Sequence, residues 1–245
     1  MSRWLWVWLV CPPSVWPQAF SLPSKEILSY NVEWRLITAG KARIEWSATP
    51  APHSGYQVDA QVESVGLVSK LFKVMDEYRA NLNSAACVQY SELTSHEGNR
   101  RRNTRITFDG DGRKARYLER DLAKNSILES REIEIPECVH DVMGGIYFLR
   151  TLNLEPGQST EVAVSDGKKS VMARVEAQQR EELKMPGGPY RTIRYEIYLF
   201  DNVLYRRSAH LYVWLTDDRR KLPVQIRVRM QFTIGTITLQ LASSE

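Results

Sequence analysis

Apolar and polar residues alternate along most of this chain, and that period of two constrains its fold more than any other feature. Successive side chains of a β-strand point to opposite faces, so the pattern is typical of strands with one buried face. The apolar sets are Leu28, Tyr30, Val32, Trp34 and Leu36; Ala42, Ile44, Trp46 and Ala48; Tyr56, Val58, Ala60 and Val62; Thr104, Ile106 and Phe108; Val171, Ala173, Val175 and Ala177; Ile193, Tyr195, Ile197 and Leu199; and Leu222, Val224, Ile226 and Val228. Turn signals at residues 38–40, 53–55 and 109–112 separate several of these sets. The sequence therefore predicts antiparallel strands joined by short turns.

One segment, residues 141–152, breaks the alternation and has apolar residues at helical spacing. Asp141 is a natural N-cap for such a helix, because its carboxylate accepts hydrogen bonds from the free backbone N–H groups. Gly144 and Gly145 lower the helix propensity but allow close packing against a sheet. We expect a mainly β protein: a single large antiparallel sheet that curls into a half-open barrel or spiral, with one short helix at about 140–152 against its concave face.

The first residues resemble an export signal. Arg3 precedes an apolar run over residues 4–10, three prolines follow within residues 12–17, and Ala19 is a suitable cleavage site. The run is too short to span a bilayer. The sequence predicts a signal peptide over 1–19, a single all-β domain over 20–245 and a periplasmic location. A buried N-terminal strand and a lipoprotein signal ending at Cys11 are the alternatives.

Two cysteines, Cys87 and Cys138, remain after removal of residues 1–19. An even number of cysteines in an exported chain predicts a disulfide, and two separate buried thiols are the alternative.

The charge and motif content excludes several classes of protein. The formal net charge is only +4, with both signs interspersed, so the sequence does not indicate a nucleic-acid partner. We find no glycine-rich phosphate loop and no metal-ligand spacing among the four histidines. We expect no cofactor and no metal.

Two pairs of neighbouring polar residues are candidates for acid–base chemistry. Asp217 and Asp218 resemble a carboxylate pair, but adjacent strand residues point to opposite faces and aspartate is common in β-turns. We interpret both as structural turn residues. His140 beside Asp141 suggests a general base, and the alternative that we favour is a structural N-cap at Asp141 with an exposed histidine next to it.

Arg150 ends the expected helix in a mostly apolar stretch, and three roles are open. It pairs with Asp217 or Asp218, caps the helix C-terminus, or contacts an anionic ligand. The basic cluster Arg100–Arg102 has a similar choice between a solvated hairpin and an anionic lipid or glycan.

A helix of about three turns covers only part of a long curled sheet. We therefore expect an apolar pocket beside it, near Tyr147, Arg150 and Trp214, with Ile197 in its wall. The ligand expected there is a lipid or another amphiphile.

Two stretches carry a resemblance to a known family, residues 138–150 and residues 212–224. The matching positions are Asp141, Tyr147, Arg150, Trp214, Asp217, Asp218, Arg220 and Pro223, supported by Tyr30, Ala39, Gly40, residues 64–66, Gly187 and Gly188. Over roughly residues 27–241 the chain resembles a bacterial envelope family, domain of unknown function 3108. The resemblance implies export and a mostly β structure, and it implies no reaction. The expected shape is similar to the half-open barrels of periplasmic lipoprotein carriers, which is an analogy of fold alone.

The sequence favours a non-enzymatic exported envelope protein that either binds an apolar or amphiphilic ligand in its curled sheet or serves as an envelope-maintenance scaffold. One alternative is a protein-interaction module that offers an exposed strand edge to a partner. The other is a hydrolase of envelope polymers that acts through Asp141, His140 or Asp217. We expect no transmembrane span.

Overall fold

The computed structural model describes residues 22–51, 54–185, 187–230 and 235–245, so the expected signal peptide lies outside the described residues. Within these ranges the chain is mainly β, with two short helices, α1 (Gly66–Leu71) and α2 (Val142–Leu149). The strands are β1 (Lys25–Trp34), β2 (Ile37–Thr49), β3 (Gly55–Ser64), β4 (Val74–Asn83), β5 (Val88–Glu97), β6 (Arg100–Asp109), β7 (Lys114–Asp121), β8 (Ser126–Glu134), β9 (Ser159–Ser165), β10 (Ser170–Met185), β11 (Gly188–Ile197), β12 (Ala209–Thr216), β13 (Pro223–Met230) and β14 (Thr236–Ser244).

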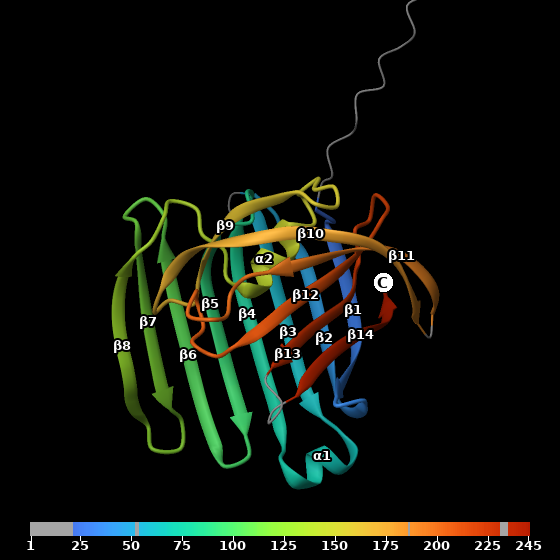
Figure 1. Ribbon diagram of the computed structural model, residues 1–245. Helices are drawn as coiled ribbons and strands as arrows, with labels where there is room; N and C mark the ends of the chain where they lie inside the picture. Colours follow the sequence, from blue (N-terminus) through green and yellow to red (C-terminus); the bar gives the residue numbers. More distant parts are fainter. Residues whose placement is uncertain (1–21, 52–53, 186, 231–234) are drawn as a thin grey trace, which may run out of the picture.

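All 14 of these strands belong to one antiparallel sheet, in the order β8-β7-β6-β5-β4-β3-β2-β1-β14-β13-β12-β11-β10-β9. The first and last strands, β1 and β14, pair in the middle of the sheet. The chain therefore runs from the middle out to one edge at β8, crosses to the other edge at β9, and returns to the middle. The helix α2 lies on this crossing, inside the curve of the sheet (Figure 1).

The sheet curls because its two halves pack on opposite sides of α2. Ile146 and Leu149 belong to an apolar cluster with β9–β13, whereas Tyr147 belongs to a second cluster with β1–β4. The apolar sets of the alternating pattern supply half of the first cluster and most of the second, and the prediction of one curled antiparallel sheet with a short helix on its concave face is confirmed.

The curl stops short of a closed barrel, because β8 and β9 are the two edges of the sheet in the described part of the chain. The turn between β9 and β10 and the segment that follows β8 both make contacts across the gap between the edges. Lys168, in the turn between β9 and β10, lies 2.8 Å from Glu129 of β8. His140 pairs with Val164 of β9 in a parallel bridge. The edge strand β8 carries several charged side chains, a common way to prevent pairing with other chains.

Three details differ from the sequence prediction. The first turn is at Arg35–Leu36 and not at residues 38–40, which belong to β2. The helix α1 was not expected, since its six residues have no buried face. The helix α2 ends at Leu149, although turn-type hydrogen bonds continue to Leu152.

The predicted disulfide is confirmed. Cys87 and Cys138 are bonded with a Cα–Cα distance of 5.2 Å and a sequence separation of 51 residues. The bond joins the turn between β4 and β5 to the segment that enters α2. A disulfide is typical of proteins that fold in an oxidising compartment, which supports a location outside the cytoplasm.

We predict that removing this bond destabilises the fold without changing its topology. A loop of this length is worth about 4 kcal/mol in the chain-entropy model. A Cys87→Ser/Cys138→Ser double variant should lose about 2–4 kcal/mol of unfolding free energy in urea denaturation. A denatured, unreduced wild-type sample should show no free thiol from these two residues, and two reactive thiols would contradict the bond.

Candidate functional site

The helix α2 begins at the N-cap that the sequence predicts. Asp141 accepts a hydrogen bond from the backbone N–H of Gly144 at 2.7 Å, and the hydroxyl of Tyr78 on β4 donates to its second carboxylate oxygen. Gly144 lies so close to Leu82 that a Cβ atom there would come within 2.7 Å of it. Burial raises the pKa of Asp141 to about 6, because the charged carboxylate is removed from water.

Arg150 ends the same helix and is buried, with 1% of its surface exposed. Its guanidinium donates to both carboxylate oxygens of Glu26 on β1, at 2.6 and 2.9 Å, and to the backbone carbonyl of Arg220 at 3.0 Å. Of the roles expected for Arg150, an ion pair is therefore correct, but its partner is Glu26 and not Asp217 or Asp218. These bonds fix the helix C-terminus to the middle of the sheet.

The two sequence stretches that carry the family resemblance meet around Arg150. Tyr147 lies under its guanidinium at 5.1 Å and stacks on Trp46 with ring centroids 4.0 Å apart. Tyr30 donates from its hydroxyl to the carbonyl of Pro223 at 2.8 Å. The helix and the turn between β12 and β13 are thus joined to the same part of β1.

Beside the helix, where the sequence predicts a pocket, the described residues line a narrow gap. Ile197 does lie beside α2, but the gap that it lines there has a volume of only about 20 Å³, room for roughly one water molecule. Tyr147 and Arg150 are buried by their own partners. Trp214 alternates with Val213, which lies in the core around the helix, so its indole points to the other face of the sheet. There it donates to Glu181 at 2.8 Å, with Arg227 over its ring.

The candidate acid–base residues do not form one group. Asp217 pairs with Arg180 at 2.9 Å. Asp218 accepts hydrogen bonds from Thr216 and from backbone N–H groups of its own turn, in agreement with a structural turn residue. The prediction of an exposed His140 is wrong.

His140 is instead 3% exposed. Its Nδ1 lies 2.8 Å from the carbonyl oxygen of Ala86, and its ring stacks on Phe148. Burial lowers the pKa of His140.

Farther from the helix, the concave face carries apolar side chains that nothing in the described chain covers completely. We call them the inner band: Val32, Trp34, Val62, Leu93, Val228 and Ile237. Their strand registers place them on the same face as the residues that contact α2. Trp34, Val62 and Leu93 are each 37% exposed. The sequence pattern assigned Val62 and Val228 to the buried face and gave no sign that they would stay accessible.

Across the sheet from the inner band, the concave face is charged. Arg102 of β6 donates to Glu119 of β7 at 2.7 Å, and Tyr117 donates to the same carboxylate at 3.0 Å. Lys168 lies 3.9 Å from Glu119. The open half of the concave face therefore has a mainly apolar side, where Asp76 pairs with Val62 across the strands, and a charged side.

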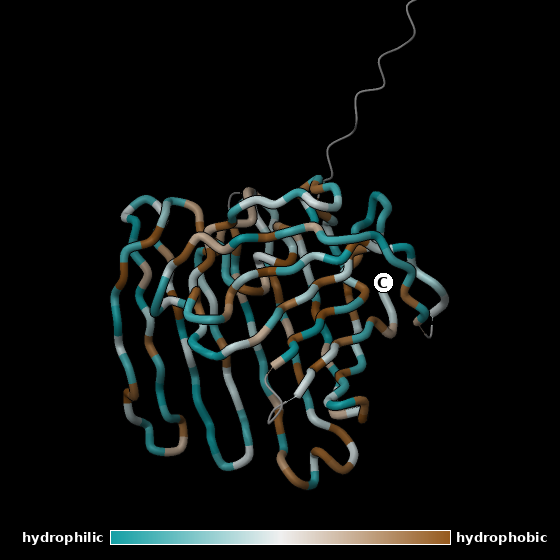
Figure 2. Tube along the Cα trace, viewed as in Figure 1, coloured by the Kyte–Doolittle hydropathy of each residue, from teal (hydrophilic) through white to brown (hydrophobic). Residues whose placement is uncertain are grey.

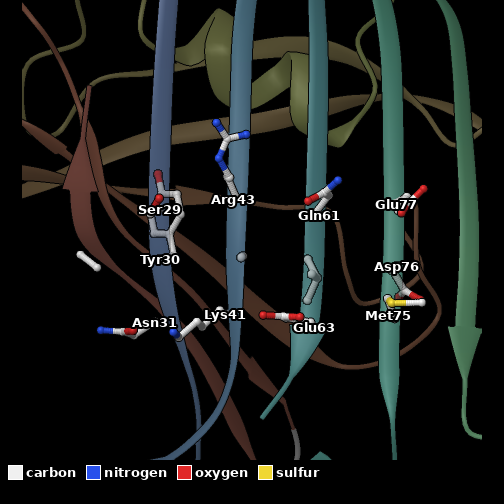
Figure 3. Close-up of a pocket in the computed structure, with 13 residues that line it drawn as sticks. Ser29, Tyr30, Asn31, Lys41, Arg43, Gln61, Glu63, Met75, Asp76 and Glu77 are labelled. Carbon is white, nitrogen blue, oxygen red and sulfur yellow. The ribbon is translucent and has the colours of Figure 1, made fainter.

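The outer face of β1–β4 has a shallow hollow of about 460 Å³ (Figure 3). Figure 3 shows α2 behind these strands, so the hollow lies on the face away from the helix. Lys41, Arg43, Glu63 and Glu77 line it, and Arg43 is paired with Glu45 at 3.0 Å. Charges of both signs line the hollow, so it indicates no particular ligand.

The described ranges show neither a metal-binding cluster nor a membrane-spanning helix. They contain no group of three or more His, Cys, Asp or Glu side chains placed to hold a metal ion. Neither helix has the length and apolar character needed to cross a bilayer.

A curled, incompletely closed sheet around a short helix places the chain in the class of β-barrel-like proteins. Residues 29–242 match the family described as protein of unknown function (DUF3108), and because this match covers nearly the whole chain, the chain belongs to that family. The resemblance seen in the sequence motifs is thereby confirmed. No curated protein gives a significant match.

One solved structure supports the fold. The chain is similar to a beta-barrel-like protein of domain of unknown function DUF1849 from Brucella abortus, with 7% identity, a TM-score of 0.55, and coverage of 91% of this chain and 97% of that chain. A DUF1089 family protein from Pseudomonas aeruginosa has 14% identity and covers 91% of this chain and 95% of its own, but its TM-score of 0.32 is too low to support an argument.

We predict that the Arg150–Glu26 pair is required for stability. Arg150→Met leaves the buried Glu26 carboxylate without its partner and should lower the unfolding free energy by about 3–5 kcal/mol. A Glu26→Leu/Arg150→Met double variant should recover much of that loss. Arg180→Met, which removes exposed pairs with Asp217 and Glu155, is the control and should cost no more than about 1 kcal/mol in urea denaturation. Equal losses for Arg150→Met and Arg180→Met would contradict the prediction.

The raised pKa of Asp141 predicts a pH dependence. The folded state holds the Asp141 proton up to about pH 6, whereas the unfolded chain releases it near its ordinary value of 3.8. The contribution of Asp141 to the unfolding free energy should therefore fall by roughly 3 kcal/mol between these values and stay level above them. Asp141→Asn keeps a capping oxygen, so the difference between its unfolding curve and that of the wild type, measured across this range, isolates the effect. Parallel curves would contradict it.

Proposed function

We propose that the protein is a non-enzymatic exported envelope protein that binds an amphiphilic molecule on the open half of its concave face. The observation that carries the proposal is the inner band, because inward-facing apolar side chains on a monomer are normally covered. The charged side formed by Arg102, Glu119 and Lys168 lies across the same concave face. Such a surface suits a molecule with an apolar chain and a polar head.

The filled half of the concave face is a different environment. The gap that the described side chains leave between α2 and Ile197 is about 20 Å³, so we place the ligand away from Ile197 and from the buried Tyr147 and Arg150. These residues hold the sheet in its curled shape. This moves the expected ligand from the side of the helix to the opposite end of the same surface.

Two other functions, hydrolysis and strand pairing with a partner, have less support. A hydrolase needs its acid–base groups in one place, and His140, Asp141 and Asp217 are each held by separate partners. A partner strand added to the edge of β8 would have to pair with a strand rich in exposed charge. An envelope scaffold without a ligand is the alternative that the experiment below separates.

The test is binding of the fluorescent fatty acid cis-parinaric acid to the mature protein. Val62→Glu places a charge within the inner band and should weaken binding at least about tenfold, because a carboxylate is costly to bury beside an acyl chain. Since Val62 is 37% exposed in the wild type, the variant should fold.

Gln61→Glu is the matched control. Gln61 precedes Val62 on β3 and points to the outer face. The Gln61→Glu substitution therefore adds the same charge without touching the inner band. Its affinity should equal that of the wild type. A wild type that binds no fatty acid and carries no co-purifying amphiphile by mass spectrometry would support the scaffold instead. Equal affinities for Val62→Glu and the wild type would reject the inner band as the binding surface.

A further inference from the structure

Exposed apolar side chains gather at one end of the curled sheet. We call residues 34–41 and 64–75 the rim patch: the first range contains the turn between β1 and β2, and the second contains α1. Its exposed apolar residues are Leu36 (94%), Leu71 (87%), Leu67 (76%), Ile37 (57%), Phe72 (51%), Met75 (43%) and Trp34 (37%). The two ranges are joined by a hydrogen bond from the N–H of Val65 to the carbonyl of Ala39. Figure 2 shows apolar colour concentrated around α1 at this end.

The turn that presents Leu36 is unfavourable for the fold. Arg35 and Leu36 are the two central residues of a tight hairpin, and both have positive φ, +49° and +69°. Such turns favour asparagine and glycine, because a branched side chain is strained in the left-handed region. Leu36 therefore costs stability through its backbone as well as through its exposure. Strain of this kind points to a role outside the folding of the chain.

The rim patch is also basic. Its two ranges contain Arg35, Lys41, Lys70 and Lys73 and no Asp or Glu, and Glu33, Glu63 and Asp76 directly flank them. The neighbouring turn between β5 and β6 is attached to it by a hydrogen bond from Gly98 to the carbonyl of Lys73 and adds the exposed Arg100.

On the other side of Leu36 lies an open groove of about 880 Å³. Arg35, Arg227 and Arg229 line it, and Glu33 is its only acidic residue among those described. The groove side of Leu36 is therefore mainly basic, whereas on the other side Lys41 and Met75 lie opposite Glu63.

We propose that the rim patch docks the protein on the surface of a bilayer that contains anionic phospholipid. The apolar side chains enter the region between head groups and acyl chains, and the basic ones lie among the phosphates, as in other interfacial segments. Charge complementarity selects this partner, since a neutral apolar partner would gain nothing from the basic border. The proposal stands whether or not the inner band binds an amphiphile.

Co-sedimentation with vesicles tests the proposal. The mature protein is mixed with vesicles of phosphatidylethanolamine containing about one quarter phosphatidylglycerol, and separately with phosphatidylcholine vesicles. Binding to the anionic vesicles should be at least about tenfold stronger and should weaken as salt is added, because the attraction is electrostatic in part. Equal, salt-independent binding to both vesicles, or no binding to either, would overturn the proposal.

Leu36→Asn is the decisive variant. Asparagine tolerates positive φ, so the thermal midpoint should stay the same or rise while binding to anionic vesicles falls several-fold. Leu67→Ser/Leu71→Ser should lower binding further, since both side chains are exposed and their loss leaves the core intact. A stable Leu36→Asn protein with unchanged binding would overturn the assignment of the rim patch.

Control substitutions elsewhere on the molecule show whether a loss of vesicle binding is specific to the rim patch. Met172→Ser removes a side chain that is 52% exposed on β10, and Arg219→Glu changes an exposed charge in the turn between β12 and β13. Both variants should bind anionic vesicles like the wild type, whereas Lys70→Glu/Lys73→Glu should lose most of this binding.

Sedimentation velocity without lipid tests the alternative that a second copy of the chain occupies the rim patch. If the wild type is a dimer, Leu36→Asn dissociates it and no vesicle binding is seen, the rim patch is an interface between two copies of the chain. That result would overturn the membrane proposal.

Discussion

The buried pair between Arg150 and Glu26 is the contact on which the curled shape depends most directly. The two residues are 124 positions apart, one at the end of the crossing helix and the other at the start of the central strand β1. Taking both charges out of water is expensive, and the bidentate geometry, the extra bond to the Arg220 carbonyl and the Tyr147 ring under the guanidinium offset that cost. Because this geometry requires the helix end, β1 and the turn between β12 and β13 to meet at one point, it excludes a flatter sheet. The disulfide fixes the other end of the crossing segment in the same way.

The position of the helix divides the concave face into two environments. Near α2 the aromatic stack of Tyr147 on Trp46 and the aliphatic side chains of β9–β13 leave almost no free volume. Beyond the helix the same alternating strands continue, but nothing in the described chain covers Val62 or Leu93 fully. A helix of eight residues is about 12 Å long, so it cannot cover strands of ten or more residues along their whole length. The open half is thus a consequence of the short helix.

The sequence predicts the parts of this fold that depend on local periodicity. Period-two alternation identifies the sheet, a cap residue identifies the start of α2, and an even cysteine count identifies the disulfide. It does not predict Glu26 as the partner of Arg150, because strand register over long separations decides that contact. It does not predict which face Trp214 occupies, because β12 has large apolar residues on both faces and alternation there is ambiguous. The turn at Arg35–Leu36 was missed because neither residue favours the conformation that it adopts.

That missed turn connects the two proposals. Trp34 belongs both to the inner band and to the rim patch, and Val62 of the inner band is followed two residues later by the start of the second rim segment. A strained, exposed leucine is a departure from local rules, and such departures are expected where function competes with folding. An amphiphile on the open half of the concave face would lie next to the rim patch, and the basic border would place that end of the protein against anionic head groups. If both proposals hold, the open half of the sheet and the strained turn have a common explanation: both would serve an end of the protein that faces a membrane.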